Sequence, residues 1–193
     1  MPEFPTNTKV RETARRNGRL SDGERFVPEE TPIAFSYAGS THAVMMATPA
    51  DLEDFAVGFS LTEGIITDPA EIETIDVEAE DKGIDLQIRL ADEQNEALVA
   101  RRRHMAGPVG CGLCGIESIE QAVRVTPSVR TSTLTLSEDE VVEAVRLLNG
   151  QQPLHMATRA VHGAGSDVPG QGLIAVRGDV GRSYEPDMLV GAE

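Results

Sequence analysis

Hydrophobic and polar residues alternate in several stretches of the chain, and this period of two predicts β-strands. Ile33, Phe35 and Tyr37 occupy every second position, and turn residues 38–40 separate them from a second β-prone stretch, 41–47. A short turn between two such stretches indicates an antiparallel hairpin. We therefore expect the first part of the core to form on two paired strands.

A second pair of predicted strands covers residues 75–79 and 84–90. From Ile84 to Leu90 every second residue is hydrophobic and the residues between are polar, so one face of the sheet should contact water. Three further segments are predicted as strands: the Thr-rich residues 129–136 and two short buried segments, 154–157 and 173–176.

Two segments show the spacing of an amphipathic helix. In the first, the hydrophobic positions i, i+3, i+4 and i+7 are Leu52, Phe55, Ala56 and Phe59. Its predicted cap is Thr48, and Gly64 predicts its end. The second helix is predicted from the capping box formed by Ser137 and Glu140, and it should stop at residues 149–150.

The remaining pattern bears on domain organisation. Residues 1–25 are polar and rich in Arg, Asn and Gly, and we expect them to be mobile or ordered only against a partner. The predicted domain covers residues 26–193. Its helices and strands interleave without a regular β-α-β rhythm, so we expect an α/β fold, or an α+β fold, with a mixed sheet.

Charge and composition argue against several classes of partner. Asp and Glu number 32 against 17 Lys and Arg, and the net charge of −15 repels phosphate, so we expect neither nucleic acid nor an anionic membrane surface as a partner. No apolar run reaches the roughly 18 residues of a membrane span. The first residues lack the apolar segment of a secretory signal, and the two cysteines form no disulfide framework, so we expect a cytoplasmic protein.

The chain has two cysteines, Cys111 and Cys114, in the sequence Gly-Cys-Gly-Leu-Cys-Gly at 110–115. Three arginines, 101–103, precede them, and a helix is predicted over 116–123. Unpaired N–H groups at a helix start and nearby guanidinium charges both favour a thiolate over a thiol. The flanking glycines leave room for another molecule to approach the sulfur. These features favour a nucleophilic cysteine over a buried packing residue.

Other chemistries for this CxxC stay open from the residues alone. A structural zinc site needs about four ligands, and His104, His155 or His162 could complete the cysteine pair only through tertiary contacts. A thioredoxin-like redox pair has the same spacing, but this chain contains no Trp to precede it. The zinc-deaminase signature is absent, because Ala43-Val44 follow His42 where that signature has x-Glu.

Outside the cysteine pair, two sets of residues are candidates for chemistry or binding. Asp51, Asp54 and Glu63 are possible general acids or bases, although a helix start explains the two aspartates more simply as cap and dipole partners. Residues 158–165 and 178–182 are polar, contain glycines and follow predicted strands, where loops commonly contact ligands.

Two segments together resemble the FdhD family of formate dehydrogenase accessory sulfurtransferases. They are residues 44–66, VMMATPADLEDFAVGFSLTEGII, and residues 110–115, GCGLCG. The similarity extends from about Pro28 to Gly191. It implies a cytidine-deaminase-like α/β fold, shortened at its C-terminus relative to the family, and a cytoplasmic homodimer.

The resemblance also implies a function. Sulfur from a cysteine desulfurase would be carried as a persulfide and passed to the molybdenum bis-guanine-dinucleotide cofactor, which formate dehydrogenase needs for activity. The persulfide would form on Cys111, with Cys114 assisting. The residues implied in cofactor binding are Thr158, His162, Asp179, Gly181 and Arg182. No metal bound by the protein itself is expected.

This chain differs from the family at some of these positions. The family segment Thr-Gly-Gly-x-His reads Thr-Arg-Ala-Val-His at residues 158–162, so both glycines are replaced. The family's His, Asn and Lys positions after Arg182 are also occupied by other residues. These differences make a second hypothesis credible, a non-catalytic module that binds the cofactor or the apo-enzyme. A structural zinc protein is the third.

Overall fold

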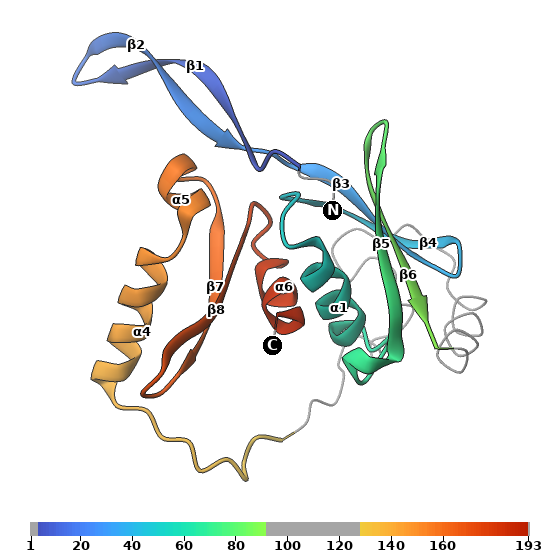
Figure 1. Cartoon of the computed structure of the whole chain (residues 1–193). Coiled ribbons are helices and arrows are strands. Elements are labelled where there is room, and N and C mark those ends of the chain that lie inside the picture. The colour runs from blue at the N-terminus through green and yellow to red at the C-terminus, as the bar shows by residue number, and fades with distance from the viewer. Residues whose placement is uncertain (1–3, 92–127, 193) are drawn as a thin grey trace, which may run out of the picture.

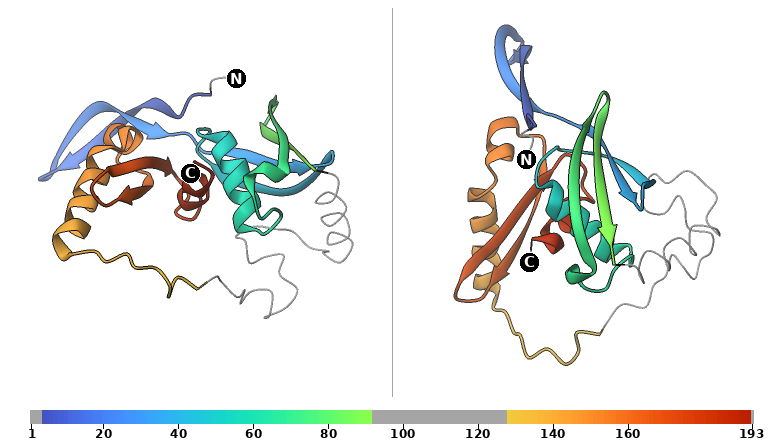
Figure 2. Two further views of the ribbon diagram at one scale, coloured as in Figure 1. Left: turned by 60° about the horizontal axis from the view of Figure 1, so that its bottom comes forward. Right: turned by 45° about the vertical axis from the view of Figure 1, so that its right-hand side comes forward.

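The computed structural model describes residues 4–91 and 128–192, whose elements form successive layers (Figure 1). A four-stranded sheet lies on one side of helices α1 (Leu52–Thr62) and α6 (Glu185–Gly191). A two-stranded sheet and helix α4 (Glu138–Gly150) lie on the other side, and Figure 2 shows the same order from two further directions. Helices α1 and α6 therefore form the layer between two sheets.

The four-stranded sheet is mixed. Its spatial order is β4-β3-β6-β5, with β3 and β6 parallel and the other two pairs antiparallel. The strand bounds are Thr31–Tyr37 for β3, Ser40–Ala47 for β4, Ile72–Glu80 for β5 and Gly83–Leu90 for β6. The expected mixed sheet with flanking helices is confirmed, whereas the implied likeness to cytidine deaminases stays a prediction.

The core lies between this sheet and α1. The alternating residues of β3 and β6 that were predicted to face inward are buried. The Phe35 ring lies with its centroid 4.9 Å from that of Phe55 and 4.3 Å from that of Phe59. Ala38 and Gly39, with φ values of 50° and 71°, make the two-residue turn between β3 and β4. Both positive values are typical of the type I′ hairpin turn.

Helix α1 has the predicted buried stripe but not the predicted cap. It begins at Leu52, and its N-cap residue is Asp51, which has a φ of 49° and makes no side-chain capping bond. The prediction that Thr48 caps this helix is therefore wrong. The Thr48 hydroxyl instead accepts a hydrogen bond from the N–H of Val180, at 3.1 Å. The Thr48 hydroxyl therefore bonds to Val180, a residue distant in the sequence, and not to the helix that begins at Leu52.

The second half contains α4, α5 (Pro153–Thr158), β7 (His162–Val168) and β8 (Gly172–Asp179). The capping box of α4 is confirmed by hydrogen bonds in both directions between Ser137 and Glu140. The segment 173–176 lies in β8 as predicted, but it is only half-buried, and Ile174 is 56% exposed.

Two strand predictions in this half are wrong. Residues 129–136 have no regular structure and are exposed. Residues 154–157 belong to α5, where Pro153 takes the first position, a place that suits its fixed φ. The Thr158 hydroxyl donates to the Leu154 carbonyl at 2.7 Å, as a side chain within a helix does. A short 3-10 helix, η1 (Pro69–Glu71), precedes β5.

An N-terminal hairpin projects from the rest of the molecule (Figure 1). Strand β1 (Asn7–Arg16) pairs antiparallel with β2 (Arg19–Pro28) across Asn17-Gly18, whose φ values are 52° and 79°. The hydrophobic pattern did not predict these strands, because most of their side chains are exposed. The expected mobility of residues 1–25 stays a prediction.

Helices α1 and α6 touch through two glycines. A Cβ atom on Gly58 would overlap the carbonyl oxygen of Asp187, and one on Gly191 would overlap that of Asp54. Small residues at a crossing let two helix backbones approach closely, as they do here. No helix in the described ranges is long and apolar enough to cross a membrane.

We expect Gly58→Ala to lower the free energy of unfolding by about 2–3 kcal/mol, because the added methyl group has no space at this crossing. Urea denaturation measures this change. Gly150→Ala is the matched control, since Gly150 ends α4 with nothing within 4 Å of its added Cβ. Equal effects of the two substitutions would contradict the close crossing.

The same helix pair holds a carboxylate that is easily protonated. The pKa of Asp187 is raised from 3.8 to about 6, above all by burial; a hydrogen bond from Thr62 lowers it and the charge of Glu63 raises it within that net shift. The folded protein therefore binds this proton more tightly than the unfolded chain does. The stability that the protonated group permits is fully present below about pH 3.8, the pKa of the unfolded chain, and is lost as the pH rises through about 6.

Asp187→Asn should therefore flatten the fall in stability across this pH range and raise the free energy of unfolding at pH 7 by about 2 kcal/mol. The amide keeps an acceptor for Thr62 but carries no charge. Denaturant titrations at a series of pH values test this, with Asp76→Asn, an exposed change on β5, as the control. An Asp187→Asn protein as pH-sensitive as the wild type would refute the assignment.

Candidate functional site

The two cysteines that were predicted as reactive, Cys111 and Cys114, lie outside the described residues. The arginines at 101–103 and the predicted helix over 116–123 lie outside them as well. The other predicted site residues are described, and three of them come together where β7 begins, β8 ends and α6 begins.

Asp179 is the centre of this junction. Its side chain is fully buried at the end of β8, where Oδ1 accepts the Thr48 N–H at 2.5 Å and Oδ2 accepts the Gly181 N–H at 2.5 Å. The Thr48 hydroxyl accepts the Val180 N–H, so this contact runs in both directions. The junction thereby ties the connection between β4 and α1 to the connection between β8 and α6.

The charge state of Asp179 reflects two opposing effects. Burial raises the pKa of the carboxyl above its ordinary value, while the surrounding N–H groups and the Thr48 hydroxyl lower it. Burial is the larger effect. A carboxylate with several donors in a buried place is well suited to fixing backbone geometry.

His162 and Glu185 lie beside Asp179. His162 pairs with Asp179 in the register of β7 and β8 and is exposed. Glu185 is 6% exposed, and its Oε2 atom accepts no hydrogen bond from the described part of the chain. Burial raises the pKa of Glu185, and the nearby Asp179 raises it too, while its own N–H, the Tyr184 N–H and the charge of His162 lower it.

A second link joins β8 to α1. The Arg177 Nε atom donates to Asp54 Oδ2 at 2.7 Å and lies 3.7 Å from Asp51 Oδ1. Burial raises the pKa of Asp51, against the lowering effect of Arg177. Asp51 and Asp54 therefore form ion pairs with Arg177 that join α1 to β8, and neither side chain caps the helix by a hydrogen bond.

Thr158 is held by a separate set of contacts at the end of α5. It is buried, and its hydroxyl accepts the Ala160 N–H at 3.3 Å in addition to donating to Leu154. Its carbonyl accepts a hydrogen bond from Arg25 of the N-terminal hairpin, at 3.2 Å. The hairpin thus contacts the segment that leads into His162.

One of the two replaced glycines of this segment keeps a glycine-like backbone. Arg159 has a φ of 56°, in the left-handed region that favours glycine, so the backbone shape typical of glycine is kept at this position. The Arg182 side chain is exposed. Gly181 is crowded, because an added Cβ would lie 2.5 Å from the Tyr184 ring and 2.9 Å from Asp179 Oδ2.

A pocket of about 330 Å³ lies next to this junction. It is lined by the start of β1, the start of α1, the α5 region and β8. Val161, Val176 and Leu154 supply apolar walls, and Asp51 and His155 are among its polar groups. Its volume and mixed lining are those of small-molecule sites. The His155 ring is fixed by a 2.9 Å hydrogen bond between Nδ1 and the Val161 carbonyl.

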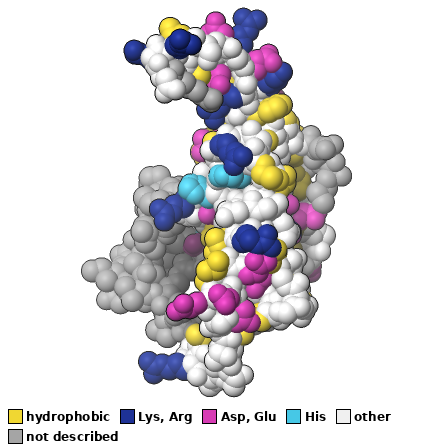
Figure 3. All heavy atoms as spheres, turned by 90° about the vertical axis from the view of Figure 1, so that its left-hand side faces the viewer, with side chains coloured by type: hydrophobic (Ala, Val, Ile, Leu, Met, Phe, Trp, Pro, Cys, Tyr) yellow, Lys and Arg dark blue, Asp and Glu magenta, His cyan; other side chains and the backbone are white. Residues whose placement is uncertain are grey.

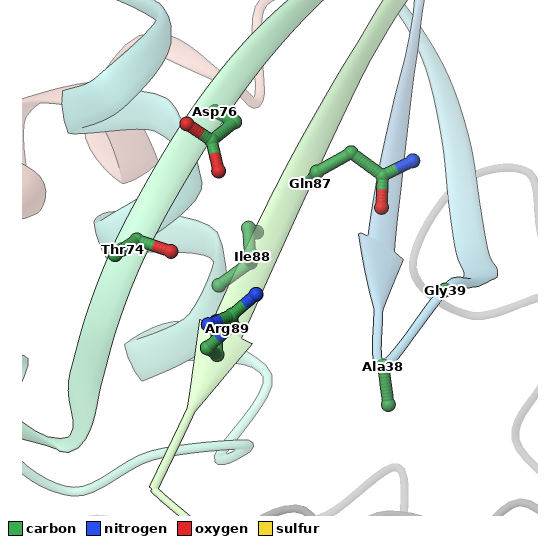
Figure 4. Close-up of a pocket in the computed structure, with 7 residues that line it drawn as sticks. All are labelled: Ala38, Gly39, Thr74, Asp76, Gln87, Ile88 and Arg89. Carbon is green, nitrogen blue, oxygen red and sulfur yellow. The ribbon is translucent and has the colours of Figure 1, made fainter.

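A second, smaller pocket of about 230 Å³ lies on the four-stranded sheet (Figure 4). Thr74 and Asp76 come from β5, Gln87 and Arg89 from β6, and the β3–β4 turn closes one side. None of the five residues implied in cofactor binding lines either pocket, but Val161 and Gly178 of the two predicted loops line the 330 Å³ pocket and no residue of those loops lines this one. The 330 Å³ pocket is therefore the better candidate for a ligand.

Only some residues of this junction were predicted from the sequence. His162, Asp179 and Gly181 come together, whereas Thr158 is bonded elsewhere and Arg182 points into solvent. The missed residues are Thr48 and Glu185, whose partners are far away in the chain, so no local motif marks them. Within residues 4–91 and 128–192 no group of three or more His, Cys, Asp or Glu side chains could hold a metal ion.

Comparison with known proteins identifies relatives over most of the chain. The profile of the FdhD/NarQ family matches residues 28–192. The chain is 60% identical to the sulfur carrier protein FdhD of Agrobacterium fabrum over 184 residues, which are 95% of this chain and 68% of that protein. It is 52% identical to the protein of the same name from Brucella abortus, with the same two coverages.

The fold has a solved counterpart. A crystal structure assigned to a formate dehydrogenase accessory protein from Desulfotalea psychrophila matches 97% of this chain and 66% of that chain, with a TM-score of 0.65 at 21% identity. This likeness concerns the fold alone. The chain spans about two thirds of the length of these relatives.

Asp179→Asn should lower the free energy of unfolding by about 1–3 kcal/mol, because the new amide group would face a backbone N–H that now donates to an oxygen. Thermal and urea denaturation give the change. Asp167→Asn, on β7 of the same hairpin, is the control for losing a carboxylate. If the two variants were equally stable, the hydrogen bonds of Asp179 would not hold the β4–α1 and β8–α6 connections together.

Proposed function

The chain belongs to the FdhD/NarQ family, and from that premise we propose that it is a sulfur carrier in the maturation of formate dehydrogenase. The observation that carries this proposal is the family match over residues 28–192 together with the presence of the chain's two cysteines in one Gly-flanked CxxC. We expect the protein to act in the reducing cytoplasm, where free thiols persist.

The first step is the loading of Cys111. Its thiolate attacks the outer sulfur of a persulfide on a cysteine desulfurase, a new S–S bond forms on Cys111, and the desulfurase thiolate leaves. This exchange needs no external oxidant or reductant. Arg101 to Arg103 would favour the thiolate that begins it.

The second step delivers the sulfur to the molybdenum bis-guanine-dinucleotide cofactor, which is the substrate of this step. Delivery as sulfide requires two electrons. Cys114 supplies them when its thiolate attacks the inner sulfur of the persulfide, which releases sulfide and leaves a Cys111–Cys114 disulfide. A dithiol reductant then restores both thiols.

We assign separate roles in binding that cofactor to different described residues. The 330 Å³ pocket beside the junction is a place for one of its ring systems. His162 and Arg182 are exposed and could contact it directly. The Asp179 carboxylate accepts the N–H groups of Thr48 and Gly181, so we assign Asp179 and Gly181 the positioning of the turn that carries Arg182. Thr158 has the same role for the segment that carries His162.

A second function, a non-catalytic module that binds the cofactor or the apo-enzyme, is favoured by one observation. Arg159 and Ala160 stand where the family has two glycines, which narrows the approach of a ligand to this backbone. Such a module would bind the cofactor, or a guanine nucleotide as its simplest fragment, without using either cysteine.

Incubation with a cysteine desulfurase and cysteine should add the mass of one sulfur atom to the wild-type protein, as intact mass spectrometry measures it. Cys111→Ala should abolish this gain, because the accepting thiolate is gone. Cys114→Ala, the matched control three positions away from it, should load sulfur and then fail to release it as sulfide.

Equal loading of wild type and Cys111→Ala would overturn the assignment of the carrier residue. An unloaded wild type that still binds a guanine nucleotide after both cysteines are changed to Ser would favour the binding module. The two proposed functions are thus separated by two readouts on the same proteins.

A further inference from the structure

Glu185 is a buried carboxylate at the junction to which the proposed mechanism gives no role. It is the first residue of α6 and is only 6% exposed, yet its Oε2 atom has no hydrogen-bond partner among the described residues. A buried carboxylate oxygen without a donor costs free energy, so native proteins rarely keep one without a reason. The free oxygen of Glu185 therefore calls for a partner that can donate a hydrogen bond.

Among the described groups, the cation whose charge acts on this carboxylate is His162. Burial raises the pKa of Glu185 and the charge of Asp179 raises it too, whereas the charge of His162 lowers it, as do the N–H groups of Tyr184 and of Glu185 itself. The fold explains this closeness, because His162 pairs with Asp179 in the register of β7 and β8, and α6 packs against both strands. The first residue of β7 and the first residue of α6 therefore lie at the same junction.

The His162 ring is exposed, and within residues 4–91 and 128–192 no hydrogen bond holds it. His155 differs in this respect, because its Nδ1 atom lies 2.9 Å from the Val161 carbonyl oxygen. A carbonyl can only accept, so this bond places the single proton of a neutral His155 ring on Nδ1. An exposed side chain that makes no such bond changes rotamer within nanoseconds, so the His162 ring is able to turn toward Glu185.

We propose that Glu185 is a positioning residue for His162: its Oε2 atom accepts one ring N–H of His162 and thereby fixes the orientation and the tautomer of the imidazole. The hydrogen bond made by one ring nitrogen decides which nitrogen carries the proton. The other ring nitrogen of His162 is then left for a ligand. The same bond gives the buried oxygen of Glu185 its missing donor, and the bond becomes charge-assisted when the ring is protonated.

An oriented imidazole matters for an anionic ligand. The chain as a whole carries a net charge of −15, but Figure 3 shows histidine side chains close to Lys or Arg side chains on the face of the molecule that carries α4 and α5. Local positive charge of this kind attracts anions. A ring that is already oriented binds such a ligand with less loss of side-chain freedom than a ring that turns freely.

Long-range ¹H–¹⁵N NMR correlation at about pH 8.5 tests the pairing, because an ordinary imidazole then carries one ring proton and its two nitrogens have distinct chemical shifts. We expect one dominant tautomer for His162 in the wild type. Glu185→Ala should move both ring nitrogens of His162 toward the shifts of a free imidazole. Glu185→Gln keeps an oxygen that accepts a hydrogen bond and should keep the wild-type tautomer. His155 is the internal control in each spectrum, since its bond to Val161 does not involve Glu185.

Two outcomes of the NMR experiment overturn the proposal. One is a His162 ring with the same ¹⁵N shifts in the wild type and in Glu185→Ala. The other is a change that appears equally in His155, because it would report a general disturbance of the fold and not the loss of one hydrogen bond. Glu185→Ala itself should fold, since it removes a buried oxygen that has no partner among the described residues.

The consequence for a ligand rests on the proposed function, in which His162 contacts the cofactor, and calorimetric titration with guanosine diphosphate tests it separately. Glu185→Ala and His162→Ala should each weaken binding by about threefold to tenfold, and the double variant should bind no more weakly than His162→Ala, because Glu185 acts only through that ring. A double variant that shows the product of the two losses overturns the positioning role. A wild type that binds no nucleotide contradicts the proposed function, while a single His162 tautomer in the same protein still supports the pairing with Glu185.

Discussion

The molecule has two halves, one with the four-stranded sheet and α1 and one with β7, β8 and α6. Their arrangement depends on the buried carboxylate of Asp179. It accepts N–H groups from both sides of the molecule, Thr48 from the end of the four-stranded sheet and Gly181 from the turn before α6. These groups are removed from water, and each would cost free energy if its partner were lost. Arg177 with Asp54 and the glycine crossing of α1 and α6 join the same two halves at further points.

Elements with a clear hydrophobic period could be predicted from the sequence, and elements without one could not. The strands of Ile33 to Tyr37 and Ile84 to Leu90 and the stripe of α1 follow from their period, because burial on one face dictates it. The N-terminal hairpin has too few buried side chains to show a period. Its Asn17-Gly18 turn was the available signal, since that pair favours the positive φ values found there.

In the candidate site, too, residues that belong to a local sequence pattern could be predicted and the others could not. The resemblance to the family named His162, Asp179 and Gly181, which lie in two glycine-containing loops, and the structure places them together. The role of Thr48 was misjudged because a hydroxyl before a helix normally caps it, and here a residue more than 130 positions away competes for that side chain. The buried Glu185 beside His162 has no local signature at all. Contacts between distant segments determine these side chains, and no window of sequence contains them.

Amide hydrogen exchange measured by NMR tests the central claim most directly. If Asp179 holds the two halves together, the N–H groups of Thr48 and Gly181 should exchange only through global unfolding, at the slowest rates in the protein. The N–H of Leu134, which donates to the exposed Ser132 hydroxyl, should exchange many times faster. Rates for Thr48 and Gly181 as fast as that of Leu134 would contradict the account.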